Sequence, residues 1–179
     1  MQAKETVTQQ PSIPTQPQGT VVEPATPMQA FWVGRGDDRL GEHLGLGISD
    51  ICFKVSTKDS QGALLVVEMT HHEKVGSGRH FHYEQDEWFY VVEGEYVFEV
   101  GQERFRLRPG DSFFGPQKVP HVWAFVGDQP GRILFIFTPA GQMEAFFRET
   151  GKANAMPPQD PAFYRAYGME LVGPPLAIE

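Results

Sequence analysis

The stretch GRHFHYEQDEWFYVVEG, residues 78–94, says more about the fold than any other part of the chain. It carries two histidines that are two positions apart, His80 and His82. On a β-strand, residues two apart point to the same face, so both imidazoles can reach one point. Glu87 follows after a short excursion and opens a run of residues typical of the next strand. A loop between the two strands would bring its carboxylate back beside the histidines.

A fourth side chain of the same kind, His121, lies further along the chain, after the turn residues Gly115 and Pro116. Three imidazoles and one carboxylate make a nitrogen and oxygen ligand set. Such a set suits Fe(II), Mn(II), Ni(II), Co(II), Cu(II) or Zn(II), and it leaves positions open for a substrate or dioxygen. The sequence therefore offers a candidate site for one divalent transition metal whose identity stays open.

Residues 48–138 as a whole indicate consecutive short strands separated by turn residues. The expected strands are 51–55, 63–69, 87–92, 95–100, 104–107, 112–114, 121–126 and 132–137. Strands at this spacing are typical of an all-β sandwich or barrel, and no part of the region has a βαβ pattern. After Pro139 the apolar spacing becomes helical, which predicts short helices over 141–150 and about 161–167.

These patterns divide the chain into three parts. Residues 30–140 form the predicted barrel, and residues 141–179 form a C-terminal helical extension. Residues 1–29 are rich in Gln, Thr and Pro and are expected to form an extended N-terminal arm. The arm is either a disordered tail or a segment that packs across its own or a neighbouring subunit.

Composition narrows the classes of function. The chain has 179 residues, a formal net charge of −8 at pH 7 and 40% hydrophobic residues, which fits a globular protein. The acidic balance argues against nucleic acid and against a polybasic membrane surface. A single cysteine, Cys52, excludes an intrachain disulfide and a cysteine-based zinc site. No apolar run approaches a membrane span, and the first residues do not resemble a secretory signal, so we expect a cytoplasmic protein.

Two segments match a known pair of motifs. Residues 80–94 fit His-x-His-(x)4-Glu-(x)6-Gly, and residues 110–121 fit Gly-(x)5-Pro-(x)4-His. In this order, they resemble the two motifs of the cupin superfamily, and the resemblance covers about residues 45–140. It implies a double-stranded β-helix, that is, a jelly-roll barrel. It also implies the identity of the metal ligands, which would be His80, His82, Glu87 and His121.

The sequence departs from the cupin pattern at three positions. Lys74 and Lys118 stand where the motifs usually have glycine, and Phe125 stands where the second motif ends in asparagine. None of these positions is a metal ligand in the family. The departures bear on the loop shape and on the polarity of the pocket.

Alternation along the strands suggests which side chains surround the metal. His121, Trp123 and Phe125 should point the same way, as should Glu87 with Phe89 and Val91 on their strand. The predicted substrate-binding residues are Trp123, Phe125, Phe89, Tyr96 and Phe98, and the alternative for each of them is a place in the hydrophobic core. The inward faces offer few cations, because Arg79 and Lys118 are at best rim residues and more often solvated. The pocket therefore favours a flat, largely apolar ligand such as a phenol or flavonoid.

The remaining histidines are not expected to contact the metal or the substrate. His71 and His72 are adjacent and cannot both face one point on a strand. We expect them to form a loop or solvent-exposed pair. His43 has no partner in the sequence.

A finer resemblance concerns residues 87–95, 109–111, 119–121, 138–141 and 167–175, which are similar to single-domain cupins described as quercetin 2,3-dioxygenase-like. This resemblance implies dioxygen-dependent ring opening of a flavonol with release of carbon monoxide. Glu87 would be the catalytic base, and burial is expected to raise its pKa toward that role.

Three alternatives stay open at this point. The same site could serve a metal-dependent isomerase, or a dioxygenase that acts on a different small carbonyl compound. The chain could also be a non-catalytic binding module, although it has no basic helix-turn-helix of the kind a DNA-binding sensor carries. The arm, the sheet edges and the Phe-bearing C-terminal helix make a homodimer plausible.

Overall fold

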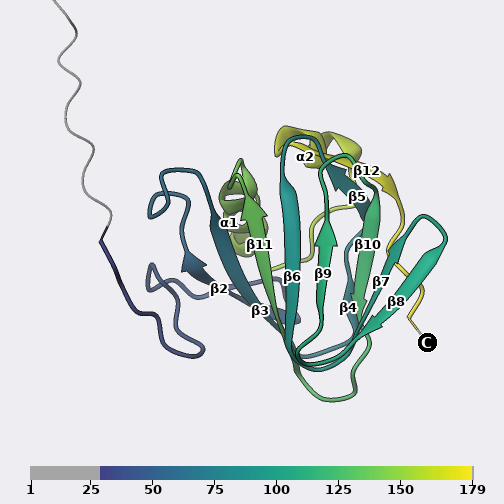
Figure 1. The fold of residues 1–179 in the computed structure, drawn as a ribbon, viewed down its shortest axis with the longest axis horizontal. Coiled ribbons are helices and arrows are strands. Elements are labelled where there is room, and N and C mark those ends of the chain that lie inside the picture. Colours follow the sequence, from purple (N-terminus) through teal and green to yellow (C-terminus); the bar gives the residue numbers. More distant parts are fainter. Residues whose placement is uncertain (1–28, 179) are drawn as a thin grey trace, which may run out of the picture.

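The computed structural model describes residues 29–178, so the N-terminal arm predicted for residues 1–29 lies almost wholly outside the described residues. Two antiparallel sheets face each other and enclose the core, as expected of a double-stranded β-helix (Figure 1). The first sheet has the order β1 (Leu44–Gly45), β2 (Ser49–Val55), β3 (Leu65–His71), β11 (Gly131–Thr138), β6 (Asp86–Glu93) and β9 (Ser112–Gly115). The second has the order β12 (Met169–Gly173), β5 (Arg79–His82), β10 (His121–Phe125), β7 (Tyr96–Val100) and β8 (Glu103–Leu107), with β4 (Val75–Gly76) paired to β10.

The inward faces of both sheets are strongly apolar, which is why the sheets pack together. The predicted alternation on β6 is confirmed, because Glu87, Phe89 and Val91 are all buried. Tyr96 and Phe98 on β7 are fully buried as well. The eight strands expected from the sequence correspond to β2, β3 and β6–β11. The all-β prediction is therefore confirmed.

Two helices follow the barrel strands, as predicted. Helix α1 (Met143–Ala153) packs on β1, and α2 (Pro161–Ala166) packs on β12. Helix α2 begins where the side chain of Asp160 accepts a hydrogen bond from the backbone N–H of Ala162 at 2.9 Å, with Pro161 in the first turn. Both helices contribute aromatic side chains to the hydrophobic core.

The C-terminal segment is not only helical, which corrects the expectation for residues 141–179. Strand β12 returns to the second sheet and pairs antiparallel with β5, placing Met169 opposite His82. Little in the sequence indicates this strand, because it is short and ends before Pro174 and Pro175. The C-terminal segment therefore braces the strand that carries two of the predicted metal ligands.

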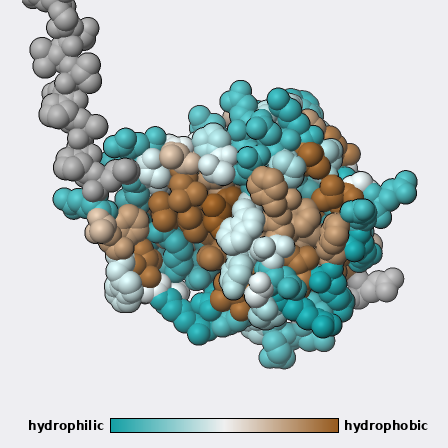
Figure 2. Space-filling view, viewed as in Figure 1, coloured by the Kyte–Doolittle hydropathy of each residue, from teal (hydrophilic) through white to brown (hydrophobic). Residues whose placement is uncertain are grey.

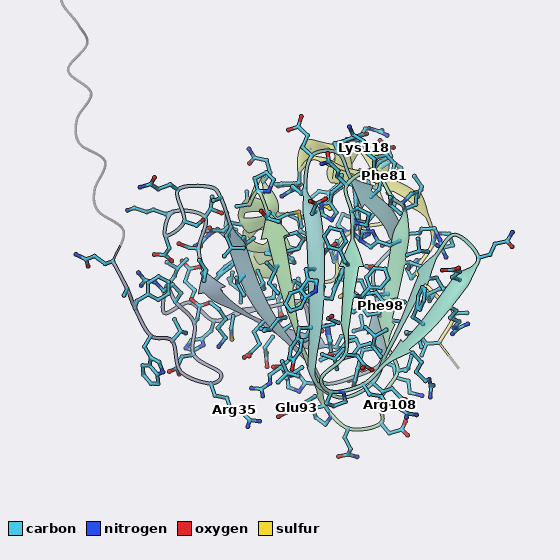
Figure 3. All side chains as sticks on the ribbon, in the orientation of Figure 1. Arg35, Phe81, Glu93, Phe98, Arg108 and Lys118 are labelled. Carbon is cyan, nitrogen blue, oxygen red and sulfur yellow. The ribbon has the colours of Figure 1, made fainter. Side chains whose placement is uncertain are left out.

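The side chains labelled in Figure 3 show which residues lie at each end of the barrel. Figure 3 places Phe98 between the two sheets, and Phe81 and Lys118 together at one end. Arg35, Glu93 and Arg108 lie at the opposite end, where Arg35 and Glu93 form an ion pair with an N···O distance of 2.7 Å. Because His80 and His82 flank Phe81 in the sequence, the predicted site belongs to the Phe81 end.

The outer face of the first sheet is partly apolar. Figure 2 shows hydrophobic side chains gathered over this face, and Trp88 and Phe114 on neighbouring strands are 38% and 56% exposed. The homodimer expected from the sequence stays a prediction. Within residues 29–178, neither helix is long and apolar enough to cross a membrane.

Candidate metal centre

The four predicted metal ligands come together between the two sheets. His80 and His82 come from β5, His121 from β10 and Glu87 from β6. Their ligand atoms all lie within 4.8 Å of one another, and all four residues are buried. His80 and His121 face each other across the pairing of β5 and β10, so the second sheet supplies all three imidazoles. The first sheet supplies the carboxylate.

Backbone carbonyls fix the orientation of two of the imidazoles. Nδ1 of His80 lies 2.8 Å from the carbonyl oxygen of Gly78, and Nδ1 of His121 lies 3.0 Å from that of Val119. A carbonyl oxygen only accepts, so each Nδ1 carries the hydrogen and donates it. The Nε2 atom of each ring is left with its lone pair, which is the arrangement that metal-binding histidines show.

A glutamine that the sequence analysis did not single out fixes the third imidazole. The side-chain amide of Gln85 donates to the carbonyl oxygens of Pro139 (3.2 Å) and Ala140 (2.7 Å). Its Oε1 atom therefore faces Nδ1 of His82, 3.3 Å away, and accepts the hydrogen bond. Gln85 is buried and sits against Gly141, where a Cβ atom would lie 2.5 Å from the Gln85 amide nitrogen. The loop after β11 thus holds His82 in place through Gln85.

With these ring orientations, the imidazoles of His82 and His121 and the carboxylate of Glu87 need a positive charge between them. Nε2 of His82 lies 3.1 Å from Oε2 of Glu87, and Nε2 of His121 lies 3.0 Å from the same oxygen. With the hydrogens on Nδ1, lone pairs of two neutral imidazoles would face a carboxylate in a buried site. Either an additional proton or a bound cation resolves this repulsion. The donor set and its orientation therefore fit a divalent transition metal.

The direction of the Glu87 pKa differs from our expectation. Burial does raise the pKa of this carboxyl group, but hydrogen bonds from His121 and His82, formed when the additional proton is on Nε2 of these rings, outweigh burial. The net result lowers the pKa of Glu87 from 4.5 to about 2. Burial alone predicts a raised pKa, but the neighbouring imidazoles favour the ionised form of Glu87. Glu87 is thus held as a carboxylate, as a metal ligand must be.

A cavity of about 60 Å³ adjoins the cluster, and both His80 and Glu87 line it. Much of the rest of its lining is apolar and aromatic, including Trp123, Phe135, Phe137, Phe146, Phe147 and Tyr164. Helices α1 and α2 contribute the last three of these. Tyr164 was not expected at the site, yet its ring centroid lies 5.8 Å from that of His80.

Of the five predicted substrate-binding residues, Trp123 lines this cavity. The other four, Phe125, Phe89, Tyr96 and Phe98, point inward as predicted but are core residues outside the lining. The reason is that part of the barrel is filled by aromatic packing. Phe98 contacts Phe89 edge-on and Phe113 face-on, with ring centroids 4.8 Å and 4.7 Å apart. The free space is left on the side of β3, Trp123 and the helices.

His71 is also placed differently from our expectation. It is not solvent-exposed but ends β3 as an inward residue that is 1% exposed and lines the cavity. Its neighbour His72 is exposed and pairs with Asp50, with an N···O distance of 2.7 Å. The alternation Leu65, Val67, Met69 predicts this if it is continued by one step.

The two candidate rim residues, Arg79 and Lys118, have structural roles. Arg79 forms an ion pair with Glu99 at 2.7 Å. Lys118 donates its backbone N–H to the carbonyl oxygen of His82 at 2.7 Å and has a positive φ of 64°. A lysine therefore adopts the left-handed conformation for which the motif usually has glycine. The loop shape is kept despite the departure from the motif.

Gln85 gives a prediction for metal affinity. Replacing Gln85 with Ala removes the acceptor that orients His82, and loss of such a partner typically weakens metal binding about 10–100-fold. We expect the metal dissociation constant of Gln85→Ala, measured by competition with a chromophoric chelator, to rise by that factor. Gln117→Ala, a change in the neighbouring loop, is the control. Equal affinities for Gln85→Ala and the wild type would show that Gln85 does not position His82.

Comparison with known proteins agrees with this geometry. Residues 65–137 match the family model of the cupin domain, Cupin_2. A segment of 55 residues is 34% identical to an uncharacterized protein of Methanocaldococcus jannaschii, covering 31% of this chain. The match spans 44% of the length of that curated relative.

Solved structures share the fold. KdgF from Halomonas sp. is 20% identical with a TM-score of 0.52, covering 62% of this chain and 94% of that chain. The polyketide cyclase RemF from Streptomyces resistomycificus is 17% identical with a TM-score of 0.51, covering 69% and 99%. An RmlC-like cupin from Shewanella frigidimarina is 23% identical with a TM-score of 0.51, covering 65% and 96%. At these identities the likeness is one of fold, so the barrel of this chain has the fold of these cupin structures, and its residues 65–137 match the cupin domain model.

Proposed function

We propose that this protein is a metal-dependent oxygenase that opens the ring of a small phenolic or enolic compound. The observation that supports the proposal is the cluster of His80, His82, Glu87 and His121, whose lone pairs converge beside an apolar, aromatic cavity. Such a cluster binds a metal and leaves open positions next to space for a ligand. The resemblance to quercetin 2,3-dioxygenase-like cupins adds flavonols to the candidate substrates.

The side chains of the site have distinct roles in this proposal. A bound metal would supply Lewis acidity, which lowers the pKa of a phenolic or enolic hydroxyl. Glu87 is ionised and can accept the proton that such a hydroxyl releases. Phe137 packs against His82 with ring centroids 5.6 Å apart, and Phe89 packs edge-on against His121 at 6.0 Å. These rings keep bulk water from the cluster and hold the imidazoles in place.

The size of the cavity bears on the substrate. Its volume of about 60 Å³ holds a few water molecules, whereas pockets for drug-sized ligands have about 300–1,000 Å³. A single phenolic ring requires modest displacement of the lining side chains. A flavonol has a fused bicycle and a further ring, so it requires α1 or α2 to move away from the barrel. We therefore place monocyclic phenols before flavonols as substrates.

The proposal is tested by oxygen uptake. Protein of known metal content is mixed with catechol, 4-methylcatechol or quercetin in air-saturated buffer, and oxygen consumption and ring-opened product are measured. We expect uptake that depends on bound metal and stops when the metal is removed by a chelator. Turnover that is equally fast without oxygen would instead support the metal-dependent isomerase. Binding of these compounds without any turnover would support a non-catalytic binding protein, and both results would overturn the oxygenase.

A further inference from the structure

His71 carries a buried polar atom that the proposed chemistry does not use. The side chain is 1% exposed, and its Nε2 atom has no hydrogen-bond partner within residues 29–178. A buried polar atom without a partner costs free energy, and a bound molecule can supply the partner. Because His71 lines the cavity that adjoins the metal cluster, a ligand in that cavity can reach it.

The hydrogen-bond partner of Nδ1 determines whether Nε2 of His71 carries the ring hydrogen. Nδ1 of His71 lies 2.7 Å from Oγ of Ser49, which is buried and has no other hydrogen-bond partner among the described residues. If Nδ1 carried the ring hydrogen, the hydroxyl hydrogen of Ser49 would have no acceptor. The hydroxyl therefore donates to Nδ1, and the ring hydrogen is on Nε2. Burial above all, with a smaller effect of His72, lowers the pKa of His71 to about 3, so the ring stays neutral at pH 7.

The position of His71 sets the length of a ligand that could contact both His71 and the metal cluster. Its ring centroid lies 5.2 Å from that of Trp123 and 5.7 Å from that of Phe125, which stacks on it. These residues are the next two inward positions on β10 after His121. At a rise of about 3.3 Å per residue, His71 is displaced from His121 by about 7–13 Å along the strand. A single substituted ring spans such a distance.

A second unpartnered group lies in the same cavity. Oγ of Ser77 is buried without a hydrogen-bond partner among the described residues, and Ser77 lines the cavity with His71. The lining around these two groups is largely apolar and includes Met69, Trp123 and Phe135. A neutral donor in apolar surroundings favours a neutral acceptor, because an unpaired carboxylate would lose its hydration there.

We propose that His71, assisted by Ser77, is a second anchor that donates a hydrogen bond from Nε2 to a carbonyl oxygen of the substrate. The substrate is then a phenol whose hydroxyl end meets the metal cluster and whose opposite end carries a carbonyl group. This inference rests on the proposed function for the metal-bound end. It goes beyond that function by naming the residue that selects among phenols.

The test compares two probes that share a ring and differ at one end. The affinities of 3,4-dihydroxybenzaldehyde and 4-methylcatechol are measured by calorimetry, without oxygen, on the zinc-loaded protein, on His71→Phe and on His72→Phe. Phenylalanine keeps a flat ring against Trp123 but removes the donor. We expect the preference for the aldehyde over the methyl compound to fall about 3–10-fold in His71→Phe. His72→Phe, a change at the exposed neighbour, should keep the wild-type preference.

The outcomes separate the anchor from the proposed function. An unchanged preference in His71→Phe would overturn the anchor while leaving phenol binding intact. Failure of both probes to bind the zinc-loaded wild type would overturn the proposed function together with the anchor that rests on it. Nitrogen NMR of the labelled protein reports on His71 directly. We expect the hydrogen on Nε2 and a shift of that signal with the aldehyde alone, whereas a hydrogen on Nδ1, or no shift with bound aldehyde, would contradict the anchor.

Discussion

Replacing Glu87 with Gln should lower oxygen-dependent turnover by about 10²–10⁴-fold while part of the metal stays bound. The carboxylate is 3% exposed and lies within 3.1 Å of both His82 and His121. Glutamine keeps the size of the side chain and one oxygen that can bind a metal. It lacks the negative charge and cannot take the proton of a phenolic hydroxyl, so the chemical step loses its base.

The control for this prediction is Glu84→Gln, which changes an exposed acid in the same loop. Its turnover and metal content should match those of the wild type. The kinetics are measured at equal metal occupancy, so that a loss of metal is not mistaken for a loss of the base. Turnover of Glu87→Gln close to that of the wild type would show that Glu87 is not the base.

The second large effect is on stability in acid. Burial is the main cause that lowers the pKa of His71 and of His80 from 6.5 to about 3, and the neighbouring histidines add to it. Below pH 6.5 the unfolded chain binds these two protons and the folded protein does not. The free energy of unfolding therefore falls as the pH drops from about 6.5 toward 3. Each histidine contributes about 1.4 kcal/mol per pH unit, or about 2.7 kcal/mol for both.

Glu87 adds to the same trend at lower pH. Its pKa in the folded protein is below its ordinary value of 4.5, so its contribution is present above pH 4.5 and is lost as the pH falls toward 2. Urea unfolding of the chelator-treated protein between pH 8 and pH 5 checks the trend. The dependence of the free energy of unfolding on pH should be near zero above pH 7. Below about pH 6.5 its slope should correspond to about two protons in the wild type and to about one proton in His71→Phe. A free energy of unfolding that is the same at pH 7 and pH 5 would contradict the assignment of two neutral buried histidines.

The sequence predicted the barrel and the clustering of His80, His82, Glu87 and His121, for physical reasons that particular residues illustrate. The strand period of two placed His80 and His82 on one face, and the turn after them returned Glu87 to the same place. Gly94, which closes the first motif, has a φ of 86°, and a Cβ atom there would lie 2.7 Å from Cα of Gly131. The motif thus reflects a tight approach of two chain segments as well as the predicted ligands.

What the sequence did not predict depends on contacts between distant segments. Gln85 acts on His82 only because the chain after β11 offers two carbonyl oxygens to its amide group. Tyr164 reaches His80 only because α2 and β12 fold back onto the barrel. Alternation along the strands predicts which side chains point inward, but it does not predict which of them line the cavity. Phe98 fills the core, whereas Trp123 borders the cavity.

The most direct test of the metal centre is elemental analysis by mass spectrometry of the tag-free protein. His121→Ala removes one ligand, and His43→Ala changes an exposed histidine outside the site. We expect about one transition metal per chain in the wild type and in His43→Ala, and much less in His121→Ala. No bound metal in the wild type, even after incubation with Fe(II), Mn(II), Ni(II), Co(II), Cu(II) or Zn(II), would contradict the account.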